Sequence, residues 1–181
     1  LYITEVKKTT KGPQITVSRT HPGLVKRLFE MQVPEIIRGE VIIKNIAREA
    51  GSRTKISVYS YDPNIDPVGA CVGQHGIRVQ KIVEELRGEK IDRIRWDSDP
   101  MQYIASALSP AKIIDVRIDN ESTKSAKVIV PDNQLSLAIG KEGQNARLAA
   151  KLTGWKIDIK SQSQAAMEDA IKNGEERGEL Y

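Results

Sequence analysis

Apolar residues recur at helical spacing in two stretches of this 181-residue chain, and short segments of alternating apolar and polar residues lie between them. The first stretch has apolar residues at positions i, i+3, i+4 and i+7, which predicts one buried face of a helix. The residues of this face are Val79, Ile82, Val83 and Leu86. A shift of 67 positions, the spacing from Gly73 to Gly140, predicts the same face on a second helix. The residues of that face are Ala146, Ala149, Ala150 and Thr153.

Each helix follows a Gly-x-x-Gly loop, at residues 73–76 and again at residues 140–143. Behind each helix the chain carries a glycine and then a Lys-Ile-Asp segment, at residues 90–92 and 156–158. One Gly-x-x-Gly loop arises by chance in many proteins, but two copies with the same helix and strand behind them form an internal repeat. The repeat divides the chain into two similar units.

The remaining pattern predicts the order α-β-β-α-α-β in both copies. In the first copy we expect a helix from Pro22, strands at 40–47 and 54–61, a short helix from Pro67, the long helix, and a strand at 90–96. In the second copy we expect a helix from Pro100, strands at 112–119 and 126–130, a short helix capped by Asp132 or Asn133, the long helix, and a strand at 155–160. Residues 97–100 join the copies and are too few for a flexible linker, so we expect a fixed relative orientation.

Both ends of the chain lie outside the repeat. Residues 2–8 and 14–18 read as two strands around Lys11-Gly12-Pro13, which predicts a hairpin. Because the chain starts at Leu1 inside the first of these strands, we expect a fragment of a longer protein. After Ser161 we expect one weak helix around residues 166–171 and an acidic, disordered segment from residue 173 onward.

Charge and composition narrow the class of protein. The chain carries 28 Lys and Arg residues against 24 Asp and Glu residues, a net charge of +4. Residues 161–181 contribute −3, so the rest of the chain carries +7, which suits an anionic partner. With 39% hydrophobic residues and no long apolar run, we expect a soluble protein without a membrane segment. One cysteine and two histidines exclude a disulfide framework and a zinc site, and fit a reducing, cytoplasmic setting.

The two loops are candidate phosphate-binding sites. A glycine at each end lets a phosphodiester backbone approach closely because no Cβ intervenes, and the following helix offers unpaired N–H groups and the positive end of its dipole. Arg78 and Lys81 add positive charge near the first loop. Lys141, Arg147 and Lys151 add it near the second. A tight turn between helices also needs glycines, but two copies flanked by cations favour phosphate binding.

Other kinds of chemistry fit the sequence poorly. A Walker loop needs Gly-x-x-x-x-Gly-Lys-Ser/Thr after a buried strand, and neither loop provides it. Cys71 aligns with Ala138 in the repeat, which indicates a packing residue rather than a nucleophile. Four aspartates in two close pairs precede or flank prolines, where turns and helix caps favour Asp, so we interpret them as caps rather than catalytic acids. They are Asp62, Asp66, Asp97 and Asp99.

Recognition of bases by aromatic stacking is also disfavoured. Aromatic residues make up 4% of the chain, with a single Phe, whereas stacking platforms are rich in them. Trp96 and Trp155 lie at the closing strands, where packing is the more common role. Base contacts would therefore use an aliphatic groove, with Val72, Ile129 and Ile139 as candidate lining residues.

Both loops resemble the KH family signature, Ile/Val-Gly-x-x-Gly between two helices, and the element order resembles the prokaryotic-type, or type II, KH fold. Asp-Pro-Val-Gly-Ala-Cys-Val-Gly at residues 66–73 and the stretch at 138–149 resemble the tandem KH domains of bacterial transcription elongation and termination factors. This resemblance covers about residues 20–160 and implies an α+β fold of two type II KH domains packed together. The implied domains are the end of an oligonucleotide-binding barrel (1–20), a first KH domain (21–97), a second KH domain (98–161) and an acidic, flexible tail (162–181).

The resemblance also implies a function: binding of single-stranded nascent RNA at RNA polymerase, with pausing, termination and antitermination as outcomes. It implies contact with RNA polymerase mainly through parts absent from this chain, with other antitermination factors as further candidate partners. We expect a monomer without enzyme activity, cofactor or membrane association. Loops and resemblance together indicate these RNA-binding residues: Gly73, Gln74, His75, Gly76, Arg78, Lys81, Gly140, Lys141, Glu142, Gly143, Gln144, Asn145, Arg147 and Lys151.

Two other function classes stay open at this point. One is the RNA-binding appendage of a KH-containing enzyme, such as an exoribonuclease or a ribosome-associated GTPase. Exoribonucleases of that kind place one KH domain before the barrel, whereas here a hairpin precedes two KH-like units. The other class is a structural scaffold for polymerase or ribosome, which an RNA titration without binding would favour.

Overall fold

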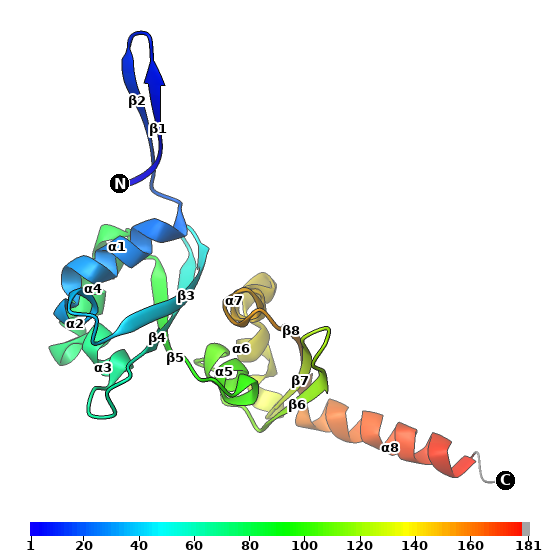
Figure 1. Cartoon of the computed structure of the whole chain (residues 1–181). Helices are drawn as coiled ribbons and strands as arrows, with labels where there is room; N and C mark the ends of the chain where they lie inside the picture. Colours follow the sequence, from blue (N-terminus) through cyan, green and yellow to red (C-terminus); the bar gives the residue numbers. More distant parts are fainter. Residues whose placement is uncertain (179–181) are drawn as a thin grey trace. The chain divides into compact units, whose positions relative to one another are not determined.

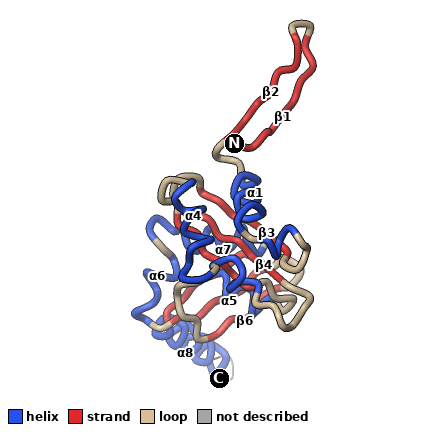
Figure 2. Tube along the Cα trace, turned by 90° about the vertical axis from the view of Figure 1, so that its left-hand side faces the viewer, coloured by secondary structure: helices blue, strands red, loops and turns tan. Residues whose placement is uncertain are grey.

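The computed structural model of the chain describes residues 1–178, with side chains through residue 175, and divides it into two units. The first unit is Leu1–Trp96 and the second begins at Asp97. Each unit contains one three-stranded sheet with its own helices (Figure 1 and Figure 2). In the described part of the chain, no helix combines the length and the apolar character that a membrane crossing requires.

The first unit opens with a two-stranded hairpin formed by β1 (Tyr2–Thr9) and β2 (Gly12–Ser18). Tyr2 pairs with Ser18 and Thr9 pairs with Gly12, so the two strands are antiparallel. Gly12 has a φ of 115°, a conformation that favours glycine at the turn. The hairpin predicted from the sequence is confirmed, and its assignment to an oligonucleotide-binding barrel stays a prediction.

The rest of the first unit follows the predicted order α-β-β-α-α-β, with one additional short helix. Its elements are α1 (Pro22–Gln32), α2 (Pro34–Ile37), β3 (Ile42–Glu49), β4 (Arg53–Tyr59), α3 (Pro67–Val72), α4 (Ile77–Glu85) and β5 (Lys90–Arg95). Strand β4 lies in the middle of the sheet, antiparallel to β3 and parallel to β5. A parallel pair requires a crossover connection, and here α3, the first Gly-x-x-Gly loop and α4 form it.

The core of the first unit lies between its helices and its sheet. Strand β4 contributes Ile56 and Val58, both fully buried. One face of α1 and the predicted face of α4 supply the opposite side, and burial of each large apolar side chain stabilises the fold by roughly 1.5–3 kcal/mol. The buried residues of these faces are Leu24, Val25 and Phe29 of α1, Val79 and Ile82 of α4, and Leu86 directly after α4.

The second unit repeats the same order and the same sheet. Its elements are α5 (Pro100–Ala107), β6 (Asp115–Asn120), β7 (Ser125–Val130), α6 (Leu135–Ile139), α7 (Gln144–Thr153) and β8 (Lys156–Ser161). Strand β7 lies in the middle, antiparallel to β6 and parallel to β8. The internal repeat and the mixed α+β fold inferred from the sequence are thereby confirmed.

Helix α7 turns a different face to its core from the one predicted. Of the predicted residues Ala146, Ala149, Ala150 and Thr153, the structure buries Ala149 alone. The observed face is displaced by one residue, which is about 100° around a helix. It brings two leucines into the core in place of small residues, so it removes more apolar area from water. The observed buried residues are Asn145, Leu148, Ala149 and Leu152.

Helix α8 (Gln162–Gly178) follows β8 and starts with two side-chain caps. Ser161 and Gln164 form a capping box, in which each side chain accepts a hydrogen bond from the backbone N–H of the other, at 3.2 and 2.9 Å. The Asp132 carboxylate accepts the N–H of Ser163 at 3.0 Å. The prediction that Asp132 or Asn133 caps the following short helix is therefore wrong, since α6 starts without a side-chain cap.

The same helix continues through the segment for which the sequence predicts disorder. It extends from the expected weak helix as far as Gly178, and residues 179–181 lie outside the described part. Ala165 is buried against the unit. Glu168 forms ion pairs with Lys127 at 2.8 Å and with Lys160 at 3.2 Å. The capping box and these contacts are the interactions that order the start of an otherwise polar helix.

Candidate nucleic-acid interface

The two Gly-x-x-Gly loops have the same backbone conformation. In the first loop the φ angles of residues 73, 75 and 76 are 75°, 52° and 74°. In the second loop the φ angles of residues 140, 142 and 143 are 80°, 55° and 74°. All six residues lie in the region of positive φ that glycine adopts at no steric cost and that most other residues avoid. The sequence repeat is therefore a repeat of local geometry as well.

The first glycine of each loop leaves no room for a side chain. A Cβ on Gly73 would lie 2.6 Å from the Cγ atom of Arg78, and one on Gly140 would lie 2.7 Å from the backbone nitrogen of Asn145. At Gly76, by contrast, nothing lies within 4 Å of the equivalent Cβ position. The first glycine thus allows the second helix to pack against the loop, and the second glycine serves the left-handed turn.

The inner residues of both loops are exposed, and each loop leads directly into a helix. Helix α4 starts after Gly76 and helix α7 after Gly143, and neither glycine provides a side-chain cap. The N–H groups of Ile77 and Gln144 donate to the carbonyl oxygens of Gln74 and Lys141. The N–H groups that follow in each first turn receive no side-chain cap, which makes each helix start suitable for an anion. The exposed residues between the glycines are Gln74, His75, Lys141 and Glu142.

Arg78 is placed differently from the expectation that it adds free positive charge to the first loop. Its Nη1 atom donates to Glu35 Oε2 at 2.8 Å and to the carbonyl oxygen of Ala70 at 2.7 Å. The guanidinium is mostly buried and its charge is compensated by Glu35. Lys81, one turn further along α4, is exposed and has no hydrogen bond or ion pair with any residue that the structure describes. Lys81 is therefore the more available cation beside the first loop.

Asn145 also departs from its predicted role as a contact residue. Its side chain is buried, with 3% of the residue exposed. The Nδ2 atom donates to the carbonyl oxygens of Leu108 at 3.0 Å and Ala138 at 2.9 Å. Asn145 thus connects α7 to α6 and to the end of α5 instead of facing a ligand. Hydrophobic periodicity did not indicate this residue, because a periodicity search counts apolar positions only.

The other candidates around the second loop stay at or near the surface. Arg147 is exposed, and its Nη1 atom donates to the carbonyl oxygen of Glu142 at 3.0 Å, which holds the guanidinium beside the loop. Lys141 and Lys151 are exposed, and Gln144 is half-buried at the start of α7. The second loop therefore has three cations at its surface, of which Arg147 is already hydrogen-bonded, while Glu142 adds one opposing charge at its tip.

The predicted aliphatic groove is only partly available. Val72 is half-buried and Ile139 is 36% exposed, both next to the first glycine of a loop. Ile129 is 4% exposed in the middle strand β7, so it belongs to the core and the prediction for this residue is wrong. An apolar contact with a base is thus offered by the residue that precedes each loop.

The cysteine and two of the four aspartates have the structural roles predicted for them, whereas Asp62 and Asp97 accept the N–H groups of Asn64 and Asp99 in turns and cap no helix. Asp66 and Asp99 accept the N–H groups of Val68 and Met101 and cap α3 and α5. Cys71 is fully buried, and this desolvation raises the pKa of its thiol to about 12. A thiol with so high a pKa is protonated at neutral pH and is a poor nucleophile.

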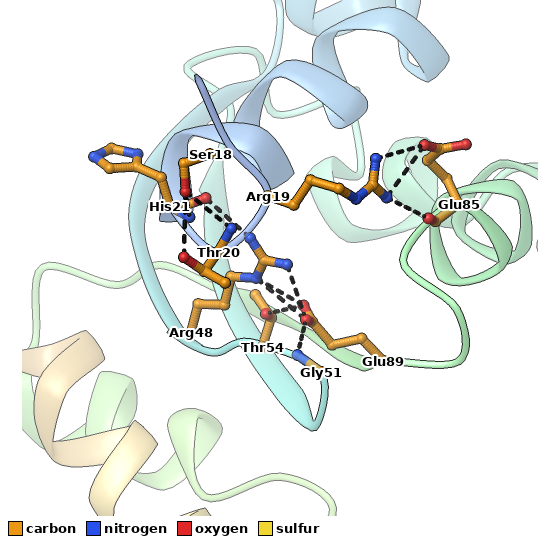
Figure 3. Close-up of polar contacts among 9 residues, drawn as sticks. All are labelled: Ser18, Arg19, Thr20, His21, Arg48, Gly51, Thr54, Glu85 and Glu89. Carbon is orange, nitrogen blue, oxygen red and sulfur yellow. Dashed lines mark hydrogen bonds and ion pairs between the residues drawn. The ribbon is translucent and has the colours of Figure 1, made fainter. Parts of the chain in front are cut away.

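Buried charges in the first unit had no signal in the sequence pattern. Arg48 and Glu89, 41 residues apart, form an ion pair of 3.0 Å with side chains 3% and 0% exposed (Figure 3). Burial opposes the ionised form of Glu89, but hydrogen bonds from Arg48, Thr54 and the Gly51 N–H outweigh it and lower the pKa of the carboxyl. The pair holds the turn between β3 and β4 against the start of β5.

Comparisons with known proteins agree with this geometry. Residues 19–96 match a family described as the NusA-like first KH domain, and residues 100–167 match the NusA-like second KH domain. The chain is 68% identical over 164 residues to the transcription termination/antitermination protein NusA of Halalkalibacterium halodurans, covering 91% of this chain and 43% of the relative. It is 68% identical over 165 residues to the same-named protein of Bacillus subtilis, covering 91% and 44%. The chain thus spans less than half the length of these curated relatives.

A solved structure supports the fold independently. The crystal structure of APE1850 matches with a TM-score of 0.54 and 24% sequence identity, covering 75% of this chain and 96% of that one. At this level of identity the likeness concerns the fold alone. A fold similar to that of most of this chain is therefore found in a solved protein of distant sequence.

Proposed function

The chain belongs to the NusA family of tandem KH proteins, and from this membership we propose that it binds single-stranded RNA and acts on nascent transcripts at RNA polymerase. The relatives are named for termination and antitermination, and we propose these outcomes, together with pausing, for the whole protein. We further propose that the chain acts by binding rather than catalysis, as a monomer in the cytoplasm. RNA polymerase would be contacted mainly by other parts of the protein, and other antitermination factors are further proposed partners.

One observation carries this proposal: the two Gly-x-x-Gly loops share one backbone conformation, and each leads into an uncapped helix start. A phosphodiester group can approach the glycines without meeting a Cβ. It then accepts hydrogen bonds from N–H groups in the first turn of α4 or α7, after the Ile77 and Gln144 N–H groups that donate within the loops, and lies at the positive end of the helix dipole. Loops of this type clamp about four nucleotides in KH domains.

The cations beside the loops supply the sequence-independent part of the affinity. Those at the surface are Lys81, Lys141, Arg147 and Lys151, whereas Arg78 is already paired with Glu35. About four phosphate contacts give a log–log salt dependence with a slope of about −2.8 for single-stranded nucleic acid. A fourfold rise in salt should then weaken binding on the order of 50-fold. The glycines position the RNA strand, and their contribution to the affinity does not depend on the salt concentration.

The experiment that tests the proposal is a titration of the chain with single-stranded RNAs of about four and about twelve nucleotides, chosen because one loop clamps about four. Since the two loops are tethered in one chain, the longer RNA should bind much more tightly than the shorter one. Duplex RNA of the same length should bind poorly, because paired bases cannot enter a loop of this kind. Absence of single-strand binding at low salt would overturn the proposal and favour a purely structural scaffold.

A further inference from the structure

A cavity of about 270 Å³ opens on the first unit at the opposite end of α4 from the Gly-x-x-Gly loop. Leu86 and Arg87, which directly follow α4, line one side of it. Arg19 and Thr20, from the segment between the hairpin and α1, line another. Arg48 and Glu89 complete its charged lining. The cavity thus joins three guanidinium groups and one carboxylate that come from distant parts of the sequence.

The single carboxylate of the lining is already saturated. Glu89 accepts hydrogen bonds from Arg48 at 3.0 Å, from the Thr54 hydroxyl at 2.7 Å and from the Gly51 N–H at 2.7 Å (Figure 3). Arg48 is also fixed, because its Nη1 atom donates to the carbonyl oxygen of His21 at 2.9 Å. The Arg48–Glu89 pair therefore forms a rigid, electrically neutral wall, which leaves Arg19 and Arg87 as the other two arginines of the cavity.

Of these two, Arg19 is paired with Glu85, and Arg87 supplies the uncompensated positive charge of the cavity. The Nη2 atom of Arg19 donates to the carbonyl oxygen of Glu85 at 2.9 Å, and its guanidinium approaches the Glu85 carboxylate at 3.4 Å (Figure 3). Arg87 is exposed, and it has no hydrogen bond or ion pair from its side chain to any residue that the structure describes. Its φ of 57° fixes the backbone at the cavity edge. The N–H groups of the Arg87 guanidinium are thus available to hydrogen-bond a ligand.

The end of α4 does not oppose an anion here as strongly as a bare helix C-terminus would. The N–H of Arg87 donates to the carbonyl oxygen of Glu84 and the N–H of Gly88 donates to that of Val83. Arg19 covers the carbonyl oxygen of Glu85. These carbonyl groups are therefore occupied, and the ligand faces guanidinium groups rather than unpaired oxygens.

We propose that this cavity binds one backbone phosphate of the RNA strand whose neighbouring nucleotides occupy the first Gly-x-x-Gly loop. The inference rests on the proposed RNA-binding function. A guanidinium presents its N–H groups in a planar fork that matches the oxygens of a phosphate. Helix α4 has nine residues, so it is about 14 Å long, which a stacked strand covers in about four nucleotides at about 3.4 Å each. A strand that extends along α4 from the loop therefore reaches Arg87, whereas a tetranucleotide held in the loop does not.

The test compares Arg87→Gln with Arg27→Gln in RNA titrations at several salt concentrations. Arg27 is an exposed arginine of α1 outside the cavity, so both variants lose the same charge from the same unit. For an RNA of about twelve nucleotides, Arg87→Gln should weaken binding about three- to tenfold and reduce the magnitude of the salt slope by about 0.7, the value for one phosphate contact. The tetranucleotide should bind equally to both variants, and Arg27→Gln should retain the wild-type slope.

Several outcomes would overturn the inference without touching the proposed function. An unchanged slope and affinity of Arg87→Gln for the long RNA, with wild-type binding intact, would exclude the cavity as an RNA contact. An equal loss in Arg27→Gln would show a general charge effect. A titration with inorganic phosphate is the third arm: phosphate binding that Arg87→Gln abolishes, without any change in RNA binding, would assign the cavity to a free anion. If the wild-type chain binds no RNA at all, the proposed function fails first.

Discussion

The guanidinium of Arg78 donates a hydrogen bond of 2.7 Å to the carbonyl oxygen of Ala70, across the loop that separates α3 from α4. In the second unit Asn145 forms the corresponding connection, with Nδ2 2.9 Å from the carbonyl oxygen of Ala138. Both donors stand five positions after the first glycine of their loop. Two different side chains at one repeat position thus hold the two loops in the same shape, and one of them does so from a buried site.

The buried position of Asn145 predicts that Asn145→Ala acts on stability rather than on RNA contact. The substitution leaves the carbonyl groups of Leu108 and Ala138 without their donor, which should lower the free energy of unfolding by about 1–3 kcal/mol. Lys151→Ala, an exposed change on the same helix, should stay within about 0.5 kcal/mol. Urea unfolding measures both. A fully stable Asn145→Ala that has lost RNA binding would contradict the structural role.

A second prediction concerns the tips of the loops. Gln74→Asp with His75→Asp, or Lys141→Asp with Glu142→Asp, keeps both glycines and changes the charge of one loop by −2. His75 and Glu142 have φ values of 52° and 55°, which Asp tolerates better than most residues. We therefore expect an almost unchanged melting temperature and sharply weaker RNA binding, with the larger loss at the second loop because Lys141 is removed.

The matched control for these variants is Ser122→Asp with Thr123→Asp. It changes the charge by the same −2 at an exposed turn between β6 and β7 that belongs to neither loop. RNA titration and calorimetry on the three proteins separate a local effect from a general one. If the loop variants stay folded and bind RNA as tightly as the control, the loops are not the binding site.

The repeat explains why so much of the fold is visible in the sequence. Glycines at 73, 76, 140 and 143 are required by positive φ or by close packing, so their spacing directly reports local geometry. The same holds for prolines after His21, Asp66 and Asp99, since each helix starts at that proline. These features depend only on residues that are close in the sequence, so the local sequence is sufficient to predict them.

What the sequence does not reveal depends on partners that are far apart along the chain. The Arg48–Glu89 pair joins residues 41 positions apart, and neither residue belongs to a recognisable motif. In α7, alanines lie on adjacent faces, so the apolar pattern leaves the buried face uncertain by one position. The observed buried face includes Asn145, a polar residue that an apolar pattern does not mark. The capping box of α8 is the exception, because Ser161-Gln162-Ser163-Gln164 is a local signature that predicts a helix start.

A third prediction follows from the lowered pKa of Glu89. Its pKa in the folded state lies below the unfolded value of about 4.3, so the carboxylate stabilises the fold above about pH 4.3 and this stabilisation is lost as the pH falls further. Glu89→Gln leaves Arg48 buried without its counter-charge and should cost about 3–5 kcal/mol at neutral pH. As the pH falls from 7, the free energy of unfolding should therefore decrease less for Glu89→Gln than for the wild type.

The control for this prediction is Glu85→Gln, which removes an exposed carboxylate from a surface ion pair with Arg19. Such pairs contribute at most about 1 kcal/mol, so the acid dependence of this variant should follow that of the wild type. Denaturant unfolding at a series of pH values provides the comparison. If the free energies of unfolding of Glu89→Gln and the wild type fall equally with decreasing pH, this carboxyl does not set the pH dependence of stability.

The last prediction separates the two demands on the loop glycines by comparing Gly140→Ala with Gly154→Ala. Gly154 is left-handed, with φ 74° and ψ 14°, so an alanine there costs about 1–2 kcal/mol. Gly140 has φ 80° and ψ 168°, a region that is essentially restricted to glycine, so an alanine there costs at least as much. Nothing lies within 4 Å of a Cβ at Gly154, but a Cβ at Gly140 meets the backbone nitrogen of Asn145 at 2.7 Å. Gly140→Ala should therefore lose about 1–3 kcal/mol more in urea unfolding, the usual cost of overpacking. It should also bind RNA less tightly, because α7 must move away from the loop, whereas Gly154→Ala should bind normally. Equal destabilisation of the two variants would show that the close approach of α7 to Gly140 contributes nothing, and that the first glycine serves only the backbone turn.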